Sequence, residues 1–362
     1  MTNGGKMPQT IETLLRINEQ HSQEFLDQKI ERIRYRGEHP TEICALKCMD
    51  GRLNLPVMTE TALGVIQPFR NLGGKFSLGW PLFQNLINEW VNYAIVRGRH
   101  SLVLVTYHKS RGDDHRGCAG FNYETDKAIT AAKTLKAQFD RVYGSGVSTL
   151  VCGIETDLDA LILHGEGGEV LDLAECKDTS KAALTAMLQE FYPSFPERVV
   201  NDLLPLVEGN VRHIRKIRAS NRPISDIVHK EWVLGIGRAF DWLHLVNTAF
   251  IVGPYDLKLE VAIETAGGLL LKNLREGRLS DDKLVMMTSA GYRSAGPEQR
   301  LAEEKAKDLA EYSVEILHRK VPDILDHLQV LTSTVNLDTR KLDVINRIEK
   351  ASELFGELVA VG

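Results

Sequence analysis

The sequence lacks the features that would place it in a membrane, on nucleic acid or in the secretory route. It has no uninterrupted apolar run of about eighteen residues, so no transmembrane helix is predicted. Its net charge is −5, which argues against a basic surface for nucleic acid. The first residues, MTNGGKMPQT, lack the charged start and apolar stretch of a secretory signal, so a cytoplasmic protein is expected.

Cysteine is scarce, with five residues, and none follows position 176. An odd number of cysteines in a long chain without a signal argues against a disulfide framework. Cys44 lies inside a predicted strand, and Cys152 and Cys176 are expected to be core or surface thiols. Cys48 and Cys118 need a different explanation.

Alternating patterns along the chain predict an α/β fold with a mostly parallel sheet flanked by helices. Amphipathic or proline-initiated segments predict helices at 10–35, 81–96 and 118–143. Apolar and β-branched runs predict strands at 41–47, 101–107, 148–156 and 160–165.

The order of patterns after residue 232 resembles that of the first half. Residues 233–242 resemble the glycine-rich loop 70–80, residues 261–278 resemble the helix 81–96, and residues 283–312 resemble the strand and helix after residue 101. Aligning Thr288 with Thr106 places Ala290 opposite His108 and Arg300 opposite Cys118. The pattern indicates an internal duplication in which the second copy has no metal ligands.

Two segments place metal-ligating residues just beyond predicted strands. EICALKCMDGR (42–52) puts Cys48 after a strand, with Asp50 and Arg52 next. SLVLVTYHKSRGDDHRGCAG (101–120) puts His108 at a strand end and Cys118 at a predicted helix start, where free N–H groups would favour its thiolate. Open α/β sheets bind ligands at the carboxyl ends of their strands, so both segments can reach one crevice. Two thiolates and an imidazole suit zinc, with the fourth position left to water as in catalytic sites.

Each of these residues alone has an ordinary structural explanation. Cys48 alone would be a buried thiol, and Asp50 with Arg52 would be a surface pair of little energy. Asp157 and Asp159, in ETDLDA, indicate a turn rather than a calcium site. The joint order of the two segments is what favours zinc.

The same motifs resemble the β-type carbonic anhydrases. The residues that carry the resemblance are CMDGR at 48–52, RNLGG at 70–74, and LVTYH through GCAG at 104–120. Within that family the chain is most similar to the carboxysome shell branch, through the long loop between histidine and cysteine and through GIETDLDALILHG (153–165). The resemblance covers roughly residues 40 to 320. It implies a zinc enzyme that reversibly hydrates carbon dioxide to bicarbonate by zinc-bound hydroxide.

The resemblance also implies residue roles. Zinc would be held by Cys48, a histidine and Cys118, Asp50 would orient the hydroxide, and Arg52 would hold Asp50. Gly51 stands where the family commonly has serine. The common spacing to the second cysteine selects His115 as the ligand, whereas the strand end selects His108, which we prefer. The glycines of RNLGG are expected to permit positive φ angles and a close approach to the site.

These interpretations divide the chain into four segments. An N-terminal helical arm (1–39) precedes a zinc-binding catalytic lobe (40–176). A helical connector (177–231) leads to a second, metal-free α/β lobe (232–362) that resembles a degenerate copy.

The same motifs are compatible with two other functions, and they also predict the partners of the protein. The zinc site could serve a hydrolase of carbonyl sulfide or carbon disulfide, or staple a catalytically silent scaffold. Carbon dioxide and bicarbonate are the expected partners, with no nucleic acid or membrane, and a homodimer or a multiple of dimers is expected. Shell-branch proteins carry a larger N-terminal region, whereas only about 40 residues precede the first motif here. A free cytoplasmic enzyme is therefore expected over one in the carboxysome, bound to its shell or to Rubisco.

Overall fold

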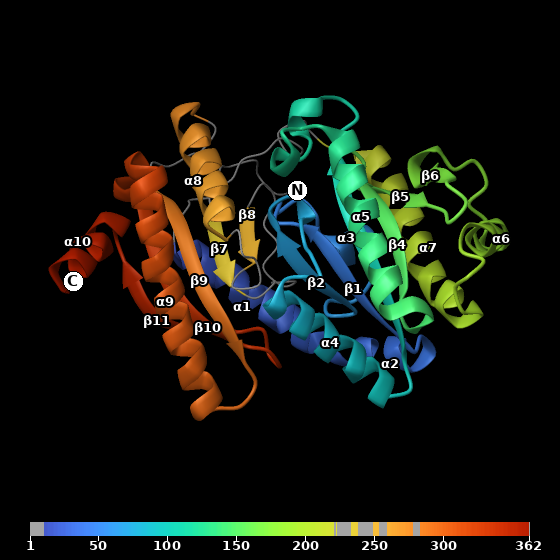
Figure 1. Cartoon of the computed structure of the whole chain (residues 1–362), viewed down its shortest axis with the longest axis horizontal. Coiled ribbons are helices and arrows are strands. Elements are labelled where there is room, and N and C mark those ends of the chain that lie inside the picture. Colours follow the sequence, from blue (N-terminus) through green and yellow to red (C-terminus); the bar gives the residue numbers. More distant parts are fainter. Residues whose placement is uncertain are drawn as a thin grey trace. The chain divides into compact units, whose positions relative to one another are not determined.

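The computed structural model describes residues 11–220, 222, 233–237, 249–252, 259–277 and 283–361 (Figure 1). The chain forms two compact units. The first unit is Gln28–Val228, and the second unit joins Met1–Asp27 to His229–Gly362. The four-segment division expected from the sequence stays a prediction.

The first unit is built on a six-stranded sheet with strand order β2-β1-β3-β4-β5-β6. Strands β2, β1, β3 and β4 are parallel, and β5 and β6 join one edge antiparallel. Their bounds are β1 Thr41–Cys48, β2 Ile66–Asn71, β3 His100–Lys109, β4 Ser148–Glu155, β5 Ala160–His164 and β6 Val170–Asp172. The predicted α/β class with a mostly parallel sheet is confirmed.

The central strands are apolar along almost their whole length because helices cover the sheet. Every residue of β1 is buried, and so is β3 from Ser101 to His108. Helices α4 and α5 lie beside each other, where the Tyr143 hydroxyl donates to Asn88 at 2.5 Å. The helices of this unit are α2 Lys29–Glu38, α3 Leu55–Met58, α4 Pro81–Val96, α5 Thr125–Tyr143, α6 Lys181–Phe191 and α7 Glu197–Ser220.

Helix α7 anchors the edge of the first unit through one buried amide. The Asn210 side chain donates to the carbonyls of Met58 and Asp159 at 3.0 and 2.8 Å and accepts from the Leu161 N–H at 2.9 Å. The amide nitrogen and the amide oxygen of Asn210 therefore both have hydrogen-bond partners inside the fold. None of the described helices in the chain is both long enough and apolar enough to cross a membrane.

The second unit carries a five-stranded sheet with strand order β11-β10-β9-β7-β8. Strands β8, β7, β9 and β10 are parallel, and β11 is antiparallel. The elements are α1 Ile11–Asp27, β7 Val233–Gly237, β8 Ala249–Val252, α8 Leu259–Arg275, β9 Leu284–Tyr292, α9 Pro297–Lys320, β10 Leu328–Asn336, β11 Leu342–Ile348 and α10 Ala351–Val361. The single helix predicted at 10–35 is divided, with α1 ending at Asp27 and α2 beginning at Lys29.

Strand pairing corrects the first part of the alignment between the two halves. Residues 233–237 form β7, which lies between β8 and β9 as β1 lies between β2 and β3. This segment therefore corresponds to a strand and not to the glycine-rich loop 70–80. The rest of that alignment, residues 238–242, lies outside the described residues.

The register corrects the counterpart of His108 by one residue. The last residues of β3 and β4 pair with each other, and so do the last residues of β9 and β10. Counting back from these ends places Gly291, rather than Ala290, opposite His108. A Cβ atom on Gly291 would lie 2.8 Å from Leu337, so a leucine fills the space that an imidazole would need.

The expected counterpart of Cys118 is also wrong. Arg300 is an exposed residue within α9. Residues 110–124 connect β3 to α5, whereas only residues 293–296 connect β9 to α9. The connection between β9 and α9 therefore has no equivalent of the segment that carries Cys118.

Candidate metal centre

The carboxyl ends of two adjacent strands bring Cys48 and His108 to one edge of the first sheet. Cys48 is the last residue of β1, and His108 is the last but one of β3. The two strands are parallel, with Leu46 paired to Val105, so their carboxyl ends meet. This edge is where open α/β sheets bind ligands.

Cys118 reaches the same place from a loop and does not begin a helix, contrary to the sequence prediction. It is followed by a single 3₁₀ turn, η3 (Ala119–Phe121), and α5 begins only at Thr125. Asn122 and Tyr123 have positive φ angles of 51° and 65°, which interrupt the helical path. The dipole of α5 therefore does not act on this thiol, whereas the backbone N–H of Gly120 in the 3₁₀ turn hydrogen-bonds it and favours the thiolate.

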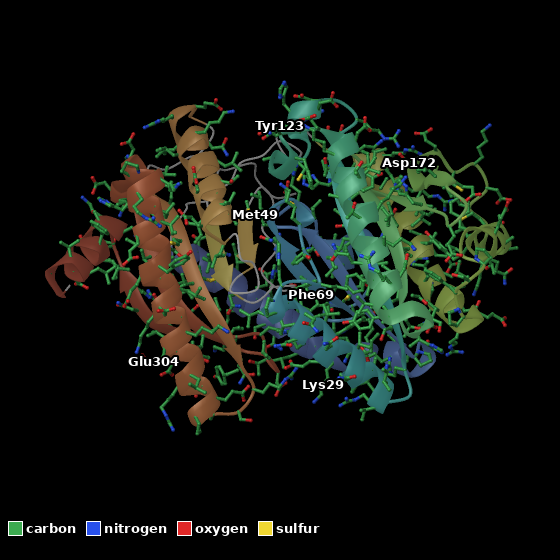
Figure 2. The ribbon with its side chains drawn as sticks, in the orientation of Figure 1. Lys29, Met49, Phe69, Tyr123, Asp172 and Glu304 are labelled. Atoms are coloured by element: carbon green, nitrogen blue, oxygen red, sulfur yellow. The ribbon has the colours of Figure 1, made fainter. Side chains whose placement is uncertain are left out.

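The donor atoms of Cys48, His108 and Cys118 all lie within 4.8 Å of one another, and the three residues are 6%, 1% and 4% exposed. Figure 2 labels their neighbours Met49 and Tyr123. The two sulfurs are 3.9 Å apart. Two sulfurs bound tetrahedrally to one zinc at about 2.3 Å would be about 3.8 Å apart. The donor set and its spacing therefore fit zinc.

The surroundings of the His108 imidazole are a second indication that these residues form a metal site. Neither of its ring nitrogens has a hydrogen-bond partner among the described residues, although both are buried. Buried polar atoms are normally paired, so an orphaned imidazole beside two thiols is the expected appearance of a ligand without its metal. His115, the alternative ligand, is exposed, lies against Tyr123, and is not part of the group.

The two thiols are unequal because they share a hydrogen bond. The bond from Cys118 lowers the pKa of Cys48 well below its usual range; burial opposes this and the nearby His108 adds to it. The same bond, together with burial, raises the pKa of Cys118 well above its usual range. Cys48 is therefore the more readily ionised of the two thiols, and a bound cation would replace the proton between the sulfurs.

Asp50 and Arg52 form a buried pair directly after Cys48. Arg52 Nη2 donates to Asp50 Oδ2 at 2.7 Å, and Nε lies 3.1 and 3.2 Å from the two carboxylate oxygens. The Arg52 backbone N–H donates to Oδ1 at 2.9 Å. Each side chain is only 4% exposed. This is the strong, two-pronged form of the arginine–carboxylate contact, and its catalytic role stays a prediction.

Two buried cations that sequence reasoning missed support the loop carrying this pair. Arg70 Nη2 donates to the carbonyls of Met49 and Asp50, both at 2.8 Å, and the Lys47 ammonium donates to the carbonyl of Leu53. Burial lowers the pKa of Arg70 to about 10, with Cys48 and Asp50 opposing, so it remains charged at neutral pH. The only sequence signal was that Arg70 stands in the motif RNLGG.

The glycines of that motif have the backbone role expected of them. Gly73 and Gly74 have φ angles of 70° and 64°. A Cβ on Gly74 would lie 3.1 Å from the Thr106 carbonyl oxygen, and a Cβ on Gly120 would lie 2.7 Å from Gly73. Glycine is therefore required for the backbone after β2 to pack against both β3 and the turn after Cys118.

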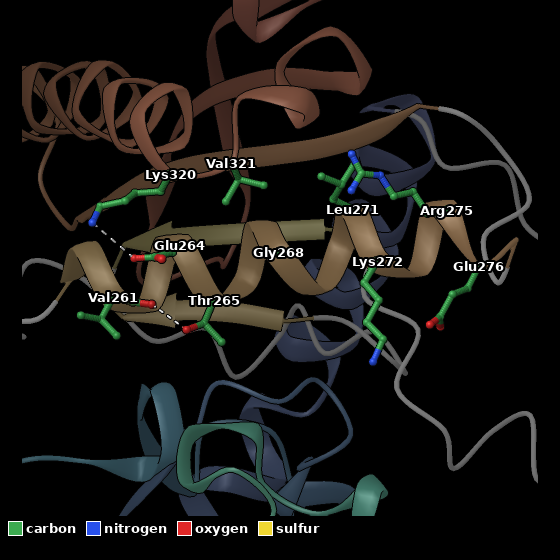
Figure 3. A pocket seen from close by; sticks show the side chains of 10 residues that line it. All are labelled: Val261, Glu264, Thr265, Gly268, Leu271, Lys272, Arg275, Glu276, Lys320 and Val321. Carbon is green, nitrogen blue, oxygen red and sulfur yellow. Dashed lines mark hydrogen bonds and ion pairs between the residues drawn. The ribbon is translucent and has the colours of Figure 1, made fainter.

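The remaining thiols and the described part of the second unit contain no comparable group. Cys44 and Cys152 are buried in strands, and Cys176 is half-buried. Within the described ranges, no other set of histidine, cysteine or carboxylate donors is gathered closely enough for a metal. The second unit has an open groove along α8 (Figure 3), whose lining contains neither cysteine nor histidine. It is lined by Val261, Glu264, Thr265, Gly268, Leu271, Lys272, Arg275, Glu276, Lys320 and Val321.

Comparison with known families agrees with this geometry. Residues 83–181 match the family model described as Carboxysome Shell Carbonic Anhydrase, catalytic domain. The matched stretch contains His108 and Cys118. The resemblance to carboxysome shell carbonic anhydrases is confirmed.

Individual relatives carry the same name. The carboxysome shell carbonic anhydrase of Prochlorococcus marinus (strain MIT 9313) is 26% identical over 260 residues, 60% of this chain and 50% of the relative. That of Hydrogenovibrio crunogenus is 28% identical over 204 residues, 49% of this chain and 37% of the relative. The chain thus spans half or less of the length of these two relatives. A solved β-carbonic anhydrase, CcaA, is 12% identical with a TM-score of 0.30, covering 45% of this chain and 89% of its own; a likeness this low does not establish a shared fold.

Proposed function

We propose that this protein is a zinc-dependent carbonic anhydrase that reversibly hydrates carbon dioxide to bicarbonate. The observation that carries the proposal is the buried group of Cys48, His108 and Cys118 next to the buried Asp50–Arg52 pair. A structural zinc normally has four protein ligands, whereas a catalytic zinc has three. Across the described part of the chain, no fourth donor joins the group. The relatives named carbonic anhydrases support the same function.

The two sulfurs and one ring nitrogen of His108 would hold the ion. Bound zinc lowers the pKa of a water ligand from about 15.7 to about 7, which supplies a nucleophile at neutral pH. The protein contributes the dry environment around the ligands, since all three are almost fully buried.

Asp50 and Arg52 would orient the attacking water. The Arg52 side chain and the Arg52 backbone N–H both donate to the Asp50 carboxylate and fix its orientation. An ionised carboxylate only accepts hydrogen bonds, so Asp50 would accept the O–H of the water and turn a lone pair of the water oxygen toward carbon dioxide. The Arg52 guanidinium fixes the carboxylate and balances its charge.

Zinc analysis and stopped-flow hydration together test the proposal. The zinc-loaded, reduced protein is expected to contain one zinc per chain and to hydrate carbon dioxide, and a chelator should abolish the activity. Asp50→Asn should keep the zinc and lose about 10²- to 10⁴-fold in rate. Hydration at the background rate by zinc-loaded wild type would overturn the proposal. Turnover of carbonyl sulfide or carbon disulfide by the same sample would then favour the hydrolase expected as an alternative.

The oligomeric state and the cellular location of the protein stay predictions. A homodimer is tested by sedimentation of the intact protein. The names of the relatives favour the carboxysome shell, whereas the sequence led us to expect a free cytoplasmic enzyme. Co-sedimentation with purified shells, scored against the soluble fraction of the same cells, separates these two.

A further inference from the structure

The loop that leads to Cys118, residues 110–116, is held by carboxylates from a different part of the chain. Arg111 pairs with Glu155, Asp172 and Glu175, and Asp157 contacts the loop at three other points. Asp157 lies in the turn between β4 and β5. Its Oδ1 accepts from the Ser110 hydroxyl at 2.8 Å, and its Oδ2 accepts from the Gly112 N–H at 2.8 Å. The Arg116 guanidinium lies 3.5 Å from the same Oδ2. Three points along residues 110–116 are therefore tied to a single side chain.

Asp157 is itself held rigidly. Its N–H donates to Glu155 Oε1 at 2.7 Å, and the Leu158 N–H donates to Oε2 of the same carboxylate at 3.0 Å. Glu155 is fully buried at the end of β4. Arg222 Nη2 donates to the Asp157 carbonyl at 3.2 Å. A carboxylate fixed on a strand end is a firm anchor for a loop.

The anchored loop connects to the catalytic pair through a shared nitrogen. Arg52 Nη2 donates to the Arg116 carbonyl at 2.8 Å, and the same nitrogen donates to Asp50 Oδ2 at 2.7 Å. Arg116 also stands only two residues before Cys118. The position of this one backbone carbonyl thus affects both the guanidinium and a metal ligand.

We propose that Asp157 is a positioning residue for the metal centre, which it serves by anchoring residues 110–116. The anchor sets the Arg116 carbonyl that orients Arg52, and it fixes the approach of Cys118 to Cys48 and His108. This inference rests on the proposed function for its activity readout and deepens it. Partners of this kind, one step removed from metal ligands, commonly change metal affinity or activity by about 10- to 100-fold.

The second unit offers a matched control. Asp338 occupies the same place in the turn after β10 and pairs with Arg293 at 2.6 Å. Both of these side chains are more than 60% exposed, and the connection there is short. Asp338→Asn therefore removes a turn aspartate without touching the metal centre.

The experiment compares Asp157→Ala, Asp157→Asn and Asp338→Asn with wild type in the full chain. Zinc affinity is measured by competition with a chelator, and the cobalt-substituted protein reports ligand geometry through its absorption spectrum. Amide hydrogen exchange reports the protection of residues 110–117, and stopped-flow hydration separates kcat from KM. Ser110→Ala removes the bond from the Ser110 hydroxyl to Asp157 and the bond that this hydroxyl accepts from the Asp113 N–H, and it serves if Asp157→Ala fails to fold.

Asp157→Ala is expected to weaken zinc binding and lower kcat by about 10- to 100-fold. It should also shift the cobalt spectrum and speed exchange in the loop. Asp157→Asn should be intermediate, because it keeps one acceptor oxygen, and Asp338→Asn should match wild type. The inference would be overturned if Asp157→Ala and Ser110→Ala both keep the zinc affinity and the loop exchange rates within twofold of wild type and leave the cobalt spectrum unchanged. If wild type binds zinc without hydrating carbon dioxide, the proposed function fails, and these three measurements still test the anchor.

Discussion

The two units share a strand order, but among the residues that the structure describes only the first unit gathers metal-binding side chains. The run β2-β1-β3-β4-β5 in the first unit corresponds to β8-β7-β9-β10-β11 in the second, each with four parallel strands followed by an antiparallel one, and the first sheet has β6 as a further strand at that edge. Because the sheets match, the difference in chemistry lies in the connections and in single side chains.

The correspondence extends to the turn that follows the fourth strand. Glu155 and Asn336, the last residues of β4 and β10, each accept the N–H groups two and three residues further on. The first N–H of each turn donates to the last residue of the neighbouring strand, at 2.9 and 2.8 Å. Asp159 and Arg340 close the turns with φ angles of 55° and 64°. These matches support the prediction that the second unit is a degenerate copy.

The comparison shows that this arrangement of strands is not sufficient to form a metal-binding site. The first unit has His108 one residue before the end of its third strand, and the second has Gly291 there, with Leu337 in the space. The long connection at 110–124 delivers Cys118, and the short one at 293–296 has no room for an equivalent. The same strand order therefore occurs with and without the metal-binding group, and the difference lies in one loop and one residue.

The largest effect should come from removing a ligand in the first unit. Cys48→Ser should reduce bound zinc from one per chain to almost none and hydration to the uncatalysed rate, because a three-ligand site cannot spare a thiolate. Cys176→Ser, outside the group and half-buried, should leave both unchanged. Zinc content and stopped-flow rates check this. Retention of stoichiometric zinc by Cys48→Ser would contradict the assigned ligand set.

The next effect compares a buried ion pair with an exposed one. Arg52→Ala should cost about 3–5 kcal/mol of unfolding free energy, because it leaves the Asp50 carboxylate buried without its cation. Arg293→Ala should cost at most about 1 kcal/mol, because its pair with Asp338 is exposed. Urea unfolding of both variants measures the difference. Equal losses would mean that the burial of the first pair has no energetic consequence.

A smaller effect compares two glycines with positive φ. Gly74→Ala should cost about 3 kcal/mol, since it adds backbone strain to close contacts with the Thr106 carbonyl and with β1. Gly277→Ala, with a φ of 64° but open space around it, should cost about 1–2 kcal/mol. Thermal and urea unfolding give both values. A Gly277 variant as damaging as the Gly74 variant would refute the packing argument.

The smallest effect concerns pH and belongs to the first unit. Burial, with help from Lys133 and Lys109, lowers the pKa of His164 to about 4, and its Nε2 lies 3.0 Å from the Tyr107 hydroxyl. The unfolded chain binds a proton near pH 6.5 that the folded chain does not, so stability falls as pH drops from about 6.5 to 4. His164→Gln should flatten this dependence, as followed by urea unfolding at pH 7, 5.5 and 4.5. Identical slopes in variant and wild type would count against it.

Sequence patterns predicted the elements whose signals are local. Helix α4 has the bounds expected from Pro81 and from Arg97-Gly98, and β1 and β3 were expected within one or two residues. Cys118 was wrongly given the start of an α-helix. Asn122 is a residue type that favours positive φ, but this preference is weak, and Tyr123 carries no such signal.

The sequence predicted which three side chains come together, but not the contacts that hold their surroundings in place. Cys48, His108 and Cys118 could be identified along the chain because each stands at a strand end or after a recognisable loop. The contacts of Asp157 connect segments more than 40 residues apart, with Ser110 47 residues away. Sequence alone identified Asp157 as a turn residue, which it is, and gave no indication of what the turn holds.

The burial of the three ligands has a consequence for how the protein matures. An ion enclosed by side chains no more than 6% exposed can enter or leave only through a local opening of the structure around them. Zinc release should therefore proceed at a rate set by that opening and become independent of chelator concentration. Metal acquisition would then be a step of late folding, after which the loaded protein keeps its ion through many catalytic cycles.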